Sequence, residues 1–288
     1  MKKLIVNADG FGFTQGINRG ILETVKEGIV TSTSCNVNFP YIQEVVELKK
    51  LKPQMSIGLH LNVNVGRPVL PIKEVPSLVN KNGEFWGNEF ANRFFKRKIN
   101  LKDIEKELDA QIQKLQELGI EISHLDGHQN KHLYPGYFEI VLKLGEKYNI
   151  KRIRCHRRYM FVNNVEHRRG KIFYYYLKHP KRIISHGFAR LQMFRAEKKG
   201  FKMADRLITP AYADNSFKYS KSTWINIIKN LPEGVNEIYC HPGYADDELR
   251  KYAKYVDERE DEIIIMKDID LIKQIEKENI ELISFNEV

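Results

Sequence analysis

The chain has 288 residues, of which 42% are hydrophobic and 29% are charged, and its formal net charge is +10 at pH 7. A chain of this length and composition can bury a full core, and one α/β domain over residues 1–288 is the simplest organisation. No stretch approaches the roughly 18 consecutive apolar residues of a membrane span, and polar residues follow "MKKLIV" too early for a secretory signal. We therefore expect a cytoplasmic protein.

Short segments rich in β-branched residues are predicted to be strands. In chain order they read "KLIV", "VTSTSCNVN", "MSIGLHLNV", "ISHLDGHQ", "KRIRC" and "VNEIYC". Helical patterns follow most of them, and the clearest helices are Gly16–Glu27, Leu101–Leu118 and Tyr137–Tyr148. Asn100 is a suitable N-cap for the second of these helices, and Gly119 ends it. Such alternation predicts a parallel sheet covered by helices, either open or closed into a barrel.

Two long insertions interrupt this alternation. Residues 64–100 follow the third strand and contain turn-prone prolines and glycines, and residues 158–203 contain a strongly basic segment. Insertions at strand ends are where α/β folds carry substrate specificity. We therefore expect these two insertions to shape what the protein binds.

The first strand leads into a glycine-rich turn, "NADGFGFTQG". Glycines between a strand and a helix are the context of a dinucleotide-binding loop, but Gly10, Gly12 and Gly16 have the spacing GxGxxxG instead of GxGxxG. A cofactor ribose would also require an acid or an arginine near the end of the second strand, and no charged residue lies between Glu27 and Glu44. A nucleotide loop is therefore disfavoured, which leaves a structural turn or a metal site.

Polar residues gather towards the ends of three predicted strands. Strand alternation groups them as Asn7 with Asp9, His60 with Asn62, and His124 with Asp126 and His128, followed by His132. A single histidine is more often a surface or hydrogen-bonded residue. Buried polar groups need partners, however, and a ligand or metal where parallel strands end would satisfy several at once. Neutral imidazoles with a carboxylate suit zinc or a similar divalent ion.

The motifs "VNADGFG", "GIVTSTS", "IGLHLN", "HLDGHQNKH" and "HPGY" resemble, in order and spacing, those of the YdjC/ChbG family of carbohydrate deacetylases. They extend from Asn7 to Tyr244. The resemblance implies a distorted (β/α) barrel of parallel strands surrounded by helices, with a divalent metal, zinc or magnesium, at its mouth. It also implies hydrolysis of the N-acetyl amide of an amino sugar in a glycan or glycolipid.

Carried over position by position, the resemblance implies roles for individual residues. His60 and His128 match the two histidine metal ligands of the family. Asp9 matches the first aspartate of the motif Asn-Ala-Asp-Asp-Phe-Gly, which corresponds to the general base, and His241 is a candidate general acid or substrate contact. Residues expected to orient the ligands or contact the substrate are Asn7, His124, Asp126, His132 and Arg154. For Asp126, a hydrogen bond that fixes the turn at Gly127 is an equal alternative.

The chain departs from the family motif at the second aspartate, the carboxylate ligand, where it has Gly10. It also has Asn130 where a histidine is usual. Because glycine offers no side-chain donor, the metal would be held by two imidazoles and waters, would recruit Asp9, or would be lost. Three interpretations remain open: an introduced inactivating substitution, a natural enzyme in which another group has taken over, or a degenerate protein that only binds sugar.

The basic segment, residues 166 to 202, contains 11 lysines or arginines but only two acids, Glu166 and Glu197, and is rich in phenylalanine and tyrosine. A solvated helical face is the simplest interpretation. Charge this local also suggests a partner. Nucleic acid is disfavoured because no recognisable binding motif accompanies it.

Basic residues mixed with aromatic rings suit peripheral contact with an anionic membrane. The corresponding substrate would be a lipid- or diphosphate-linked N-acetyl sugar. We expect helices in the segment, divided into shorter pieces by Pro180 and Gly187.

Overall fold

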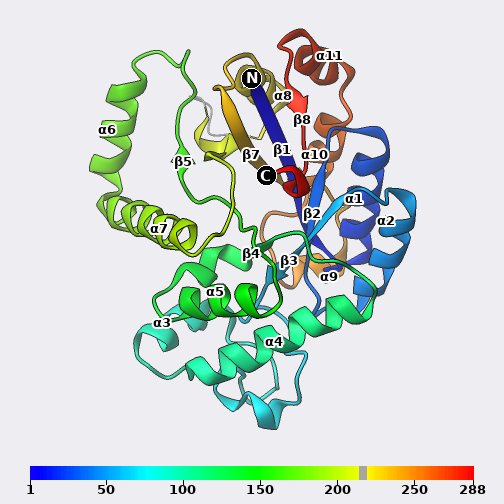
Figure 1. Ribbon diagram of the computed structural model, residues 1–288, viewed down its shortest axis with the longest axis vertical. Helices are drawn as coiled ribbons and strands as arrows, with labels where there is room; N and C mark the ends of the chain where they lie inside the picture. Colours follow the sequence, from blue (N-terminus) through cyan, green and yellow to red (C-terminus); the bar gives the residue numbers. More distant parts are fainter. Residues whose placement is uncertain (214–218) are drawn as a thin grey trace.

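The computed structural model describes residues 1–213 and 219–288, and its parallel strands curl into a half-barrel surrounded by helices (Figure 1). This arrangement confirms the expected α/β barrel of parallel strands. The sheet has the order β4-β3-β2-β1-β7-β6-β5, and β8 also pairs with β1. The strands are β1 (Lys2–Phe11), β2 (Ser32–Cys35), β3 (Ser56–Leu61), β4 (Leu125–Gly127), β5 (Arg158–Tyr159), β6 (Arg206–Ile208), β7 (Gly234–Cys240) and β8 (Glu281–Leu282).

Helices surround the sheet, and the bounds of three of them were well predicted by apolar periodicity and caps. The helices are α1 (Gln15–Glu27), α2 (Val45–Leu51), α3 (Phe90–Phe95), α4 (Leu101–Glu117), α5 (Tyr137–Lys147), α6 (Arg168–Lys178), α7 (Pro180–Lys198), α8 (Lys221–Lys229), α9 (Asp247–Arg250), α10 (Glu258–Met266) and α11 (Ile269–Lys277). The predicted bounds of α1, α4 and α5 agree with these to within one residue. As expected, the Asn100 side chain caps α4 by accepting a hydrogen bond from the Lys102 backbone N–H (2.9 Å).

The predicted strand "KRIRC" is wrong as a regular strand, because residues 151–155 form only isolated bridges. The segment nevertheless follows β4 closely. The Leu125 N–H donates to the Arg152 carbonyl (3.0 Å), and the Arg154 N–H donates to the Leu125 carbonyl (2.9 Å). These bonds place Arg154 beside the residues that follow Leu125.

The strand β1 is longer than the predicted "KLIV", and it contains a β-bulge near its end. The register with β2 shifts between Asp9 and Phe11, and the intervening Gly10 has a φ of +107°. Residues with a Cβ are strained at this φ, so glycine suits the position. The strand therefore includes Asp9 and Gly10 themselves.

The insertion at residues 64–100 lies against α4. Short 3₁₀ turns and α3 make up much of it. The buried Glu107 of α4 accepts hydrogen bonds from the backbone N–H groups of Val69 (2.9 Å) and Leu70 (3.1 Å). A carboxylate on a regular helix thus fixes the start of an irregular loop.

The basic segment forms the helices α6 and α7. Pro180 begins α7, which confirms the predicted division there. The predicted division at Gly187 is wrong, because α7 continues through this residue to Lys198. A glycine inside a helix costs only about 1 kcal/mol and does not by itself end the helix. Throughout the described ranges, no helix has both the length and the hydrophobicity to cross a bilayer.

Candidate functional site

The sheet register brings the predicted polar residues together at the carboxyl ends of the central strands. Asp9 of β1 lies opposite Ser34 of β2, and His60 of β3 lies opposite Asp126 of β4. All four residues are at most 6% exposed. The strands therefore build a buried polar cluster inside an apolar fold, and each of its groups requires a partner.

Asp126 holds His60 in one orientation. His60 Nδ1 donates to Asp126 Oδ1 (2.7 Å), and the Ser34 hydroxyl donates to Asp126 Oδ2 (2.9 Å). Burial raises the pKa of Asp126, but His60 and Arg154 outweigh this effect, so the pKa is lowered and the carboxylate is ionised. With Nδ1 engaged, His60 presents Nε2 for other contacts. A carboxylate behind an imidazole is the usual support of a histidine metal ligand.

Arg154 is the positive centre of the cluster. Its guanidinium forms two hydrogen bonds to Asp9, both 2.6 Å, and ion pairs with Asp126 (3.0 Å) and with Glu237 of β7 (2.7 Å). Burial raises the pKa of Asp9, but the charge and hydrogen bonds of Arg154 lower it by more, so the net shift is downward. Asn7 adds a hydrogen bond to Asp9 through Nδ2 (2.8 Å). Asp9 is therefore held as an oriented, ionised carboxylate.

Two residues of the cluster were missed in the sequence. Ser34 lies in the family-like motif "GIVTSTS", but no role was assigned to it. Glu237 is the one charged residue in the predicted strand "VNEIYC", and that charge is a signal that could have identified it. Burial raises the pKa of Glu237 to about 7, and Arg154 opposes this shift.

Asp9, His60 and Asp126 offer ligand atoms that all lie within 4.8 Å of one another, so this buried group could hold a metal ion. His128 lies next to the group, with its ring centroid 5.5 Å from that of His60. Burial lowers the pKa of His128 to about 3, which keeps the imidazole neutral. Burial lowers the pKa of His60, but Asp126 and Asp9 outweigh this effect, so the net shift is upward. Imidazoles beside carboxylates fit a divalent metal such as zinc.

A pocket of about 710 Å³ opens onto this group at the mouth of the half-barrel. Six of the predicted positions line it: Asp9, Gly10, His60, His128, Arg154 and His241. Its wall includes Phe13 and Tyr252, whose rings pack edge to face at 5.7 Å. A polar floor with an aromatic wall suits a ligand that has both hydroxyl groups and apolar faces.

Other predicted residues lie outside the lining of the pocket. His124 stacks on Phe285 with a centroid distance of 3.6 Å, and His132 Nε2 contacts His156 Nε2 at 3.2 Å. Asn7 and Asp126 do not line the pocket themselves, but they hydrogen-bond to Asp9 and His60, which do. The pocket therefore includes only part of the group that strand alternation predicted.

His241 follows β7 and faces the buried Glu262 of α10. Its backbone N–H donates to Glu262 Oε2 (2.7 Å), and its Nδ1 lies 4.0 Å from Oε1. Burial lowers the pKa of His241 to about 3, with a further contribution from Arg259, and burial raises the pKa of Glu262 to about 7. Near neutral pH, His241 is therefore neutral and Glu262 can hold a proton. Nothing in the sequence singled out Glu262.

The position of Gly10 has room for a side chain. A Cβ built there would meet Asn36 Nδ2 at 3.7 Å and Ile17 at 3.9 Å, which are ordinary contacts. Asn36 also lines the pocket, is 1% exposed, and its side-chain oxygen has no hydrogen-bond partner among the described residues. The polar side chain that this Cβ would meet is thus the buried amide of Asn36.

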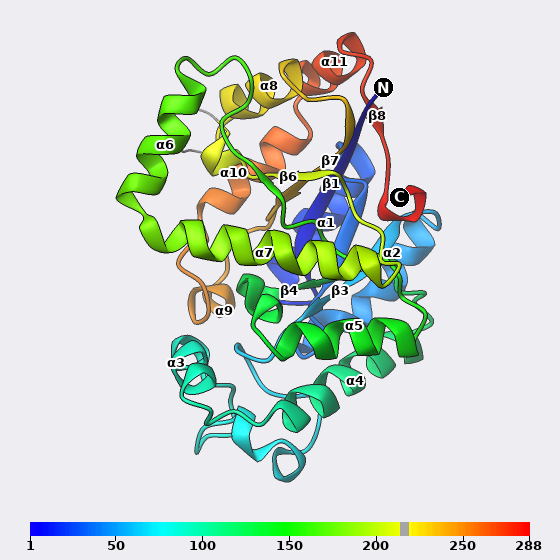
Figure 2. The same cartoon turned by 60° about the vertical axis from the view of Figure 1, so that its left-hand side comes forward.

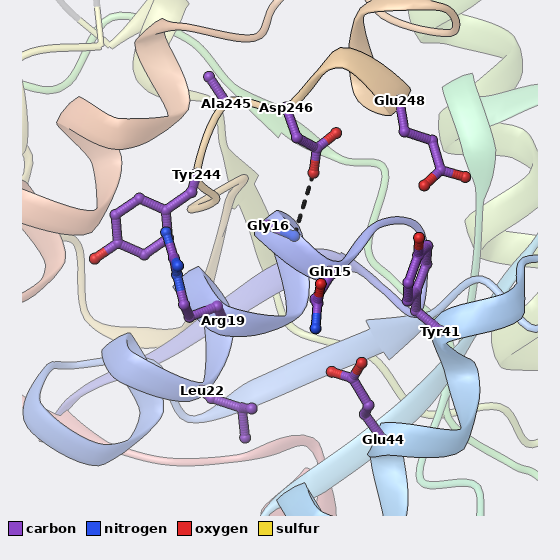
Figure 3. A pocket seen from close by; sticks show the side chains of 10 residues that line it. All are labelled: Gln15, Gly16, Arg19, Leu22, Tyr41, Glu44, Tyr244, Ala245, Asp246 and Glu248. Carbon is purple, nitrogen blue, oxygen red and sulfur yellow. Dashed lines mark hydrogen bonds between the residues drawn. The ribbon is translucent and has the colours of Figure 1, made fainter.

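The glycine-rich turn after β1 does not present a free helix N-terminus to a phosphate. Figure 3 shows Asp246 above the first turn of α1, where it accepts hydrogen bonds from the Gly16 N–H (3.2 Å) and the Thr14 hydroxyl (2.6 Å). An aspartate therefore already occupies the position in which a helix N-terminus would hold an anion. This contact agrees with the spacing of the glycines in disfavouring a nucleotide loop.

Comparison with known proteins extends these observations. A profile of the YdjC-like protein family matches residues 3–277. The carbohydrate deacetylase of Thermoanaerobacter pseudethanolicus is 30% identical over 289 residues, which cover 99% of each chain. The carbohydrate deacetylase of Listeria monocytogenes serotype 4a is 31% identical over 287 residues, covering 99% of this chain and 100% of that protein.

A solved structure is similar over nearly the whole chain. It is the crystal structure of a candidate cellobiose-phosphate cleavage protein from Enterococcus faecalis V583, with a TM-score of 0.77, 29% identity, and coverage of 99% of this chain and 98% of that one. Together with the polar cluster at the strand ends, these similarities show that the chain belongs to the YdjC-like family, which includes relatives named carbohydrate deacetylase.

Proposed function

We propose that this protein is a metal-dependent deacetylase that hydrolyses the N-acetyl amide of an amino sugar. The observation that carries the proposal is the presence, in one pocket, of two imidazoles and an oriented carboxylate. His60, His128 and Asp9 all line that pocket. In metal-dependent amide hydrolysis, imidazoles can hold the metal and a carboxylate can act as the base.

His60 Nε2 and His128 would hold the metal, with Asp126 supporting His60 from behind. A divalent metal bound there would lower the pKa of a bound water and polarise the acetyl carbonyl. Gly10 supplies no third ligand, and Asn36 is the adjacent side chain that offers a free oxygen. Both carboxylate oxygens of Asp9 already accept hydrogen bonds from Arg154, which leaves Asp9 less available as a metal ligand.

Asp9 would act as the general base and take a proton from the attacking water. Its lowered pKa keeps it ionised at neutral pH, and Arg154 fixes its direction. His241, with Glu262 behind it, would contact the leaving amine, whose nitrogen must gain a proton. The Glu262 carboxyl group, whose pKa is raised to about 7, supplies a proton reservoir for this step.

The substrate we propose is an N-acetylated amino sugar, because relatives of this chain are named carbohydrate deacetylases. The aromatic rings of Phe13 and Tyr252 would pack against the apolar face of a sugar ring. The alternative is a degenerate protein that binds sugar without cleaving it. The absence of a ligand at Gly10 is the observation that favours this alternative.

The test compares the purified chain with His128→Ala and with a control, His167→Ala, whose side chain is 82% exposed. Bound zinc is measured by mass spectrometry, and acetate release is measured on N-acetylglucosamine oligomers. We expect His128→Ala to lose both zinc and acetate release, and His167→Ala to keep both. Unchanged acetate release in His128→Ala would overturn the proposal, and sugar binding without acetate release in the unmodified chain would favour the sugar-binding alternative.

A further inference from the structure

The junction of α6 and α7 projects from the molecule. Every residue from Leu177 to Ser185 is exposed. Figures 1 and 2 both place this junction at the outer edge of the molecule. We call residues 169–185 the α6–α7 corner. A run of exposed residues this long in a helical hairpin is a surface that the described part of the chain leaves uncovered.

The corner exposes large apolar side chains. Phe173, Leu177 and Ile184 are 72%, 67% and 76% exposed, and Tyr174 and Ile183 are also more than half exposed. On α6, Phe173 and Leu177 are four residues apart and therefore lie on one helix face. Scattered apolar residues are normal on a protein surface, but a cluster on one projecting feature indicates a binding surface.

The same surface is strongly basic. Residues 168–198 contain nine lysines or arginines and one acid, Glu197. The ion pairs of α7 with the body of the protein lie near its other end, at Arg195 with Glu139 (2.6 Å) and at Glu197 with Arg157. In the described part of the chain, no carboxylate pairs with the corner cations Lys178, Lys181 and Arg182.

A pocket of about 630 Å³ lies in the corner. Its lining includes Lys171, Tyr174, Lys178 and Arg182. The Lys178 ammonium lies 4.5 Å from the centre of the Tyr174 ring. Lysine and arginine side chains around a pocket offer several donors to a phosphate group, and the rings bordering them are suited to the apolar region beneath a headgroup.

We propose that the α6–α7 corner docks onto the surface of an anionic phospholipid bilayer. Basic residues would pair with lipid phosphates, while Phe173, Leu177 and Ile184 enter the interface. A second copy of the chain is disfavoured because the two basic surfaces would repel each other. Nucleic acid would account for the charge, but the aliphatic residues at the tip of the corner would have no suitable contact there.

The position of the corner agrees with a substrate presented at a membrane. In Figures 1 and 2 the corner and α3 lie on the left-hand side of the molecule. Asn88, just before α3, lines the pocket of the candidate site. A bilayer that contacts the corner would therefore lie on the same side as α3.

The test is co-sedimentation of the full chain with vesicles of equimolar phosphatidylglycerol and phosphatidylcholine, and with vesicles of phosphatidylcholine alone. We expect binding to the anionic vesicles only. Raising the salt concentration from about 0.01 M to about 0.15 M shortens the Debye length from about 30 Å to about 8 Å and should release the protein. Binding to neither kind of vesicle, or equal binding to both, would overturn the proposal.

Charge-removing variants test whether vesicle binding depends on the corner itself or only on the net charge of the protein. Lys178→Gln, Lys181→Gln and Arg182→Gln together should lower vesicle partitioning by about 100-fold, because each basic residue at an anionic surface contributes about a fivefold factor. The matched control removes the same charge on the opposite side of Figure 1, with Lys49→Gln, Lys50→Gln and Lys52→Gln at the end of α2. Equal partitioning of the two triple variants would contradict docking through the corner.

A third variant tests the apolar contribution and the other possible occupants. Ile183→Ser with Ile184→Ser should weaken vesicle binding while the net charge stays the same. Analytical ultracentrifugation shows whether these changes instead separate a dimer into monomers, which would identify the corner as a contact between copies and overturn the proposal. Tighter binding to a short DNA duplex than to anionic vesicles at the same salt would also overturn it. None of these measurements depends on deacetylase activity.

Discussion

Arg154 and Asp9 form a bidentate ion pair, in which the Nη1 and Nη2 atoms of Arg154 each lie 2.6 Å from a different carboxylate oxygen of Asp9. Both side chains are buried. The pair has two effects on Asp9: it fixes the direction of the carboxylate, and it lowers a pKa that burial would otherwise raise. The function proposed for Asp9 therefore depends on Arg154.

Arg154→Lys should lower kcat/KM for deacetylation by about 10- to 100-fold, the range typical of residues that orient a site. Lysine keeps the charge but cannot form two parallel hydrogen bonds to one carboxylate. The pKa of Asp9 should then rise, and because the base must be ionised, the acid limb of the pH profile of kcat/KM should move to higher pH. An acid limb at the same pH in both proteins would show that Arg154 does not set the ionisation of Asp9.

The helices and the central strands could be predicted because their signals are local. The α4 helix has regular apolar spacing, an Asn100 cap and Gly119 after its end, and the structure agrees with all three. The segment around Arg154 could not be predicted as it is, because its bonds to Leu125 depend on the closure of the sheet. Gly187 predicts a break in the helix, but α7 continues through this residue because the part of the helix that follows it is packed against the protein.

The candidate site was predicted partly by strand alternation and partly by family resemblance. Alternation placed His60 and Asp126 on inward faces, and the register of β3 and β4 makes them neighbours. The partnership of Arg154 with Glu237 joins residues 83 positions apart and had no local signal. The contact of Glu262 with His241 likewise arises from the packing of α10 against the end of β7.

Gly10→Asp should increase the amount of metal bound per chain and the rate of acetate release. The new carboxylate would lie beside Asn36 in the pocket that contains His60 and His128. Losing a metal ligand should weaken binding by more than the 10- to 100-fold typical of a residue behind the ligands, so restoring it should produce at least that gain. Metal content is measured by mass spectrometry after equilibrium dialysis against zinc.

Gly10→Ala is the matched control, because it imposes the same backbone strain without adding a ligand. At a φ of +107°, any residue with a Cβ should lower the free energy of unfolding of the metal-free protein by about 1–3 kcal/mol. Zinc should recover this loss in Gly10→Asp but not in Gly10→Ala. Equal zinc content in the two variants would show that the metal does not use this position.

Glu107→Gln should destabilise the insertion at residues 64–100. An amide has only one acceptor oxygen, so one of the two backbone N–H groups now bonded to Glu107 would lose its partner. The expected loss in the free energy of unfolding is about 1–3 kcal/mol, and amide hydrogen exchange at Val69 and Leu70 should become faster. Glu105→Gln on the same helix removes a surface ion pair with Lys143 and should change stability by less than about 1 kcal/mol. Equal effects of the two changes would contradict an anchoring role for Glu107.

The buried pair of His132 and His156 should make the protein less stable as the pH falls. The two Nε2 atoms lie 3.2 Å apart, so one ring must donate and the other accept, and both cannot be protonated in this contact. Burial lowers the pKa of His132 to about 3, whereas its value in the unfolded chain is about 6.5. Between these values the unfolded state binds a proton that the folded state does not, so stability falls with decreasing pH.

His132→Gln tests this directly, because an amide can replace the contact to His156 but does not titrate. Its free energy of unfolding, measured by urea denaturation between pH 7 and pH 5, should fall less steeply than that of the unmodified protein. The difference in slope should approach 1.4 kcal/mol per pH unit, about one proton, once the pH is well below 6.5. The same slope in both proteins would mean that His132 is already protonated in the folded state, which its contact with His156 opposes.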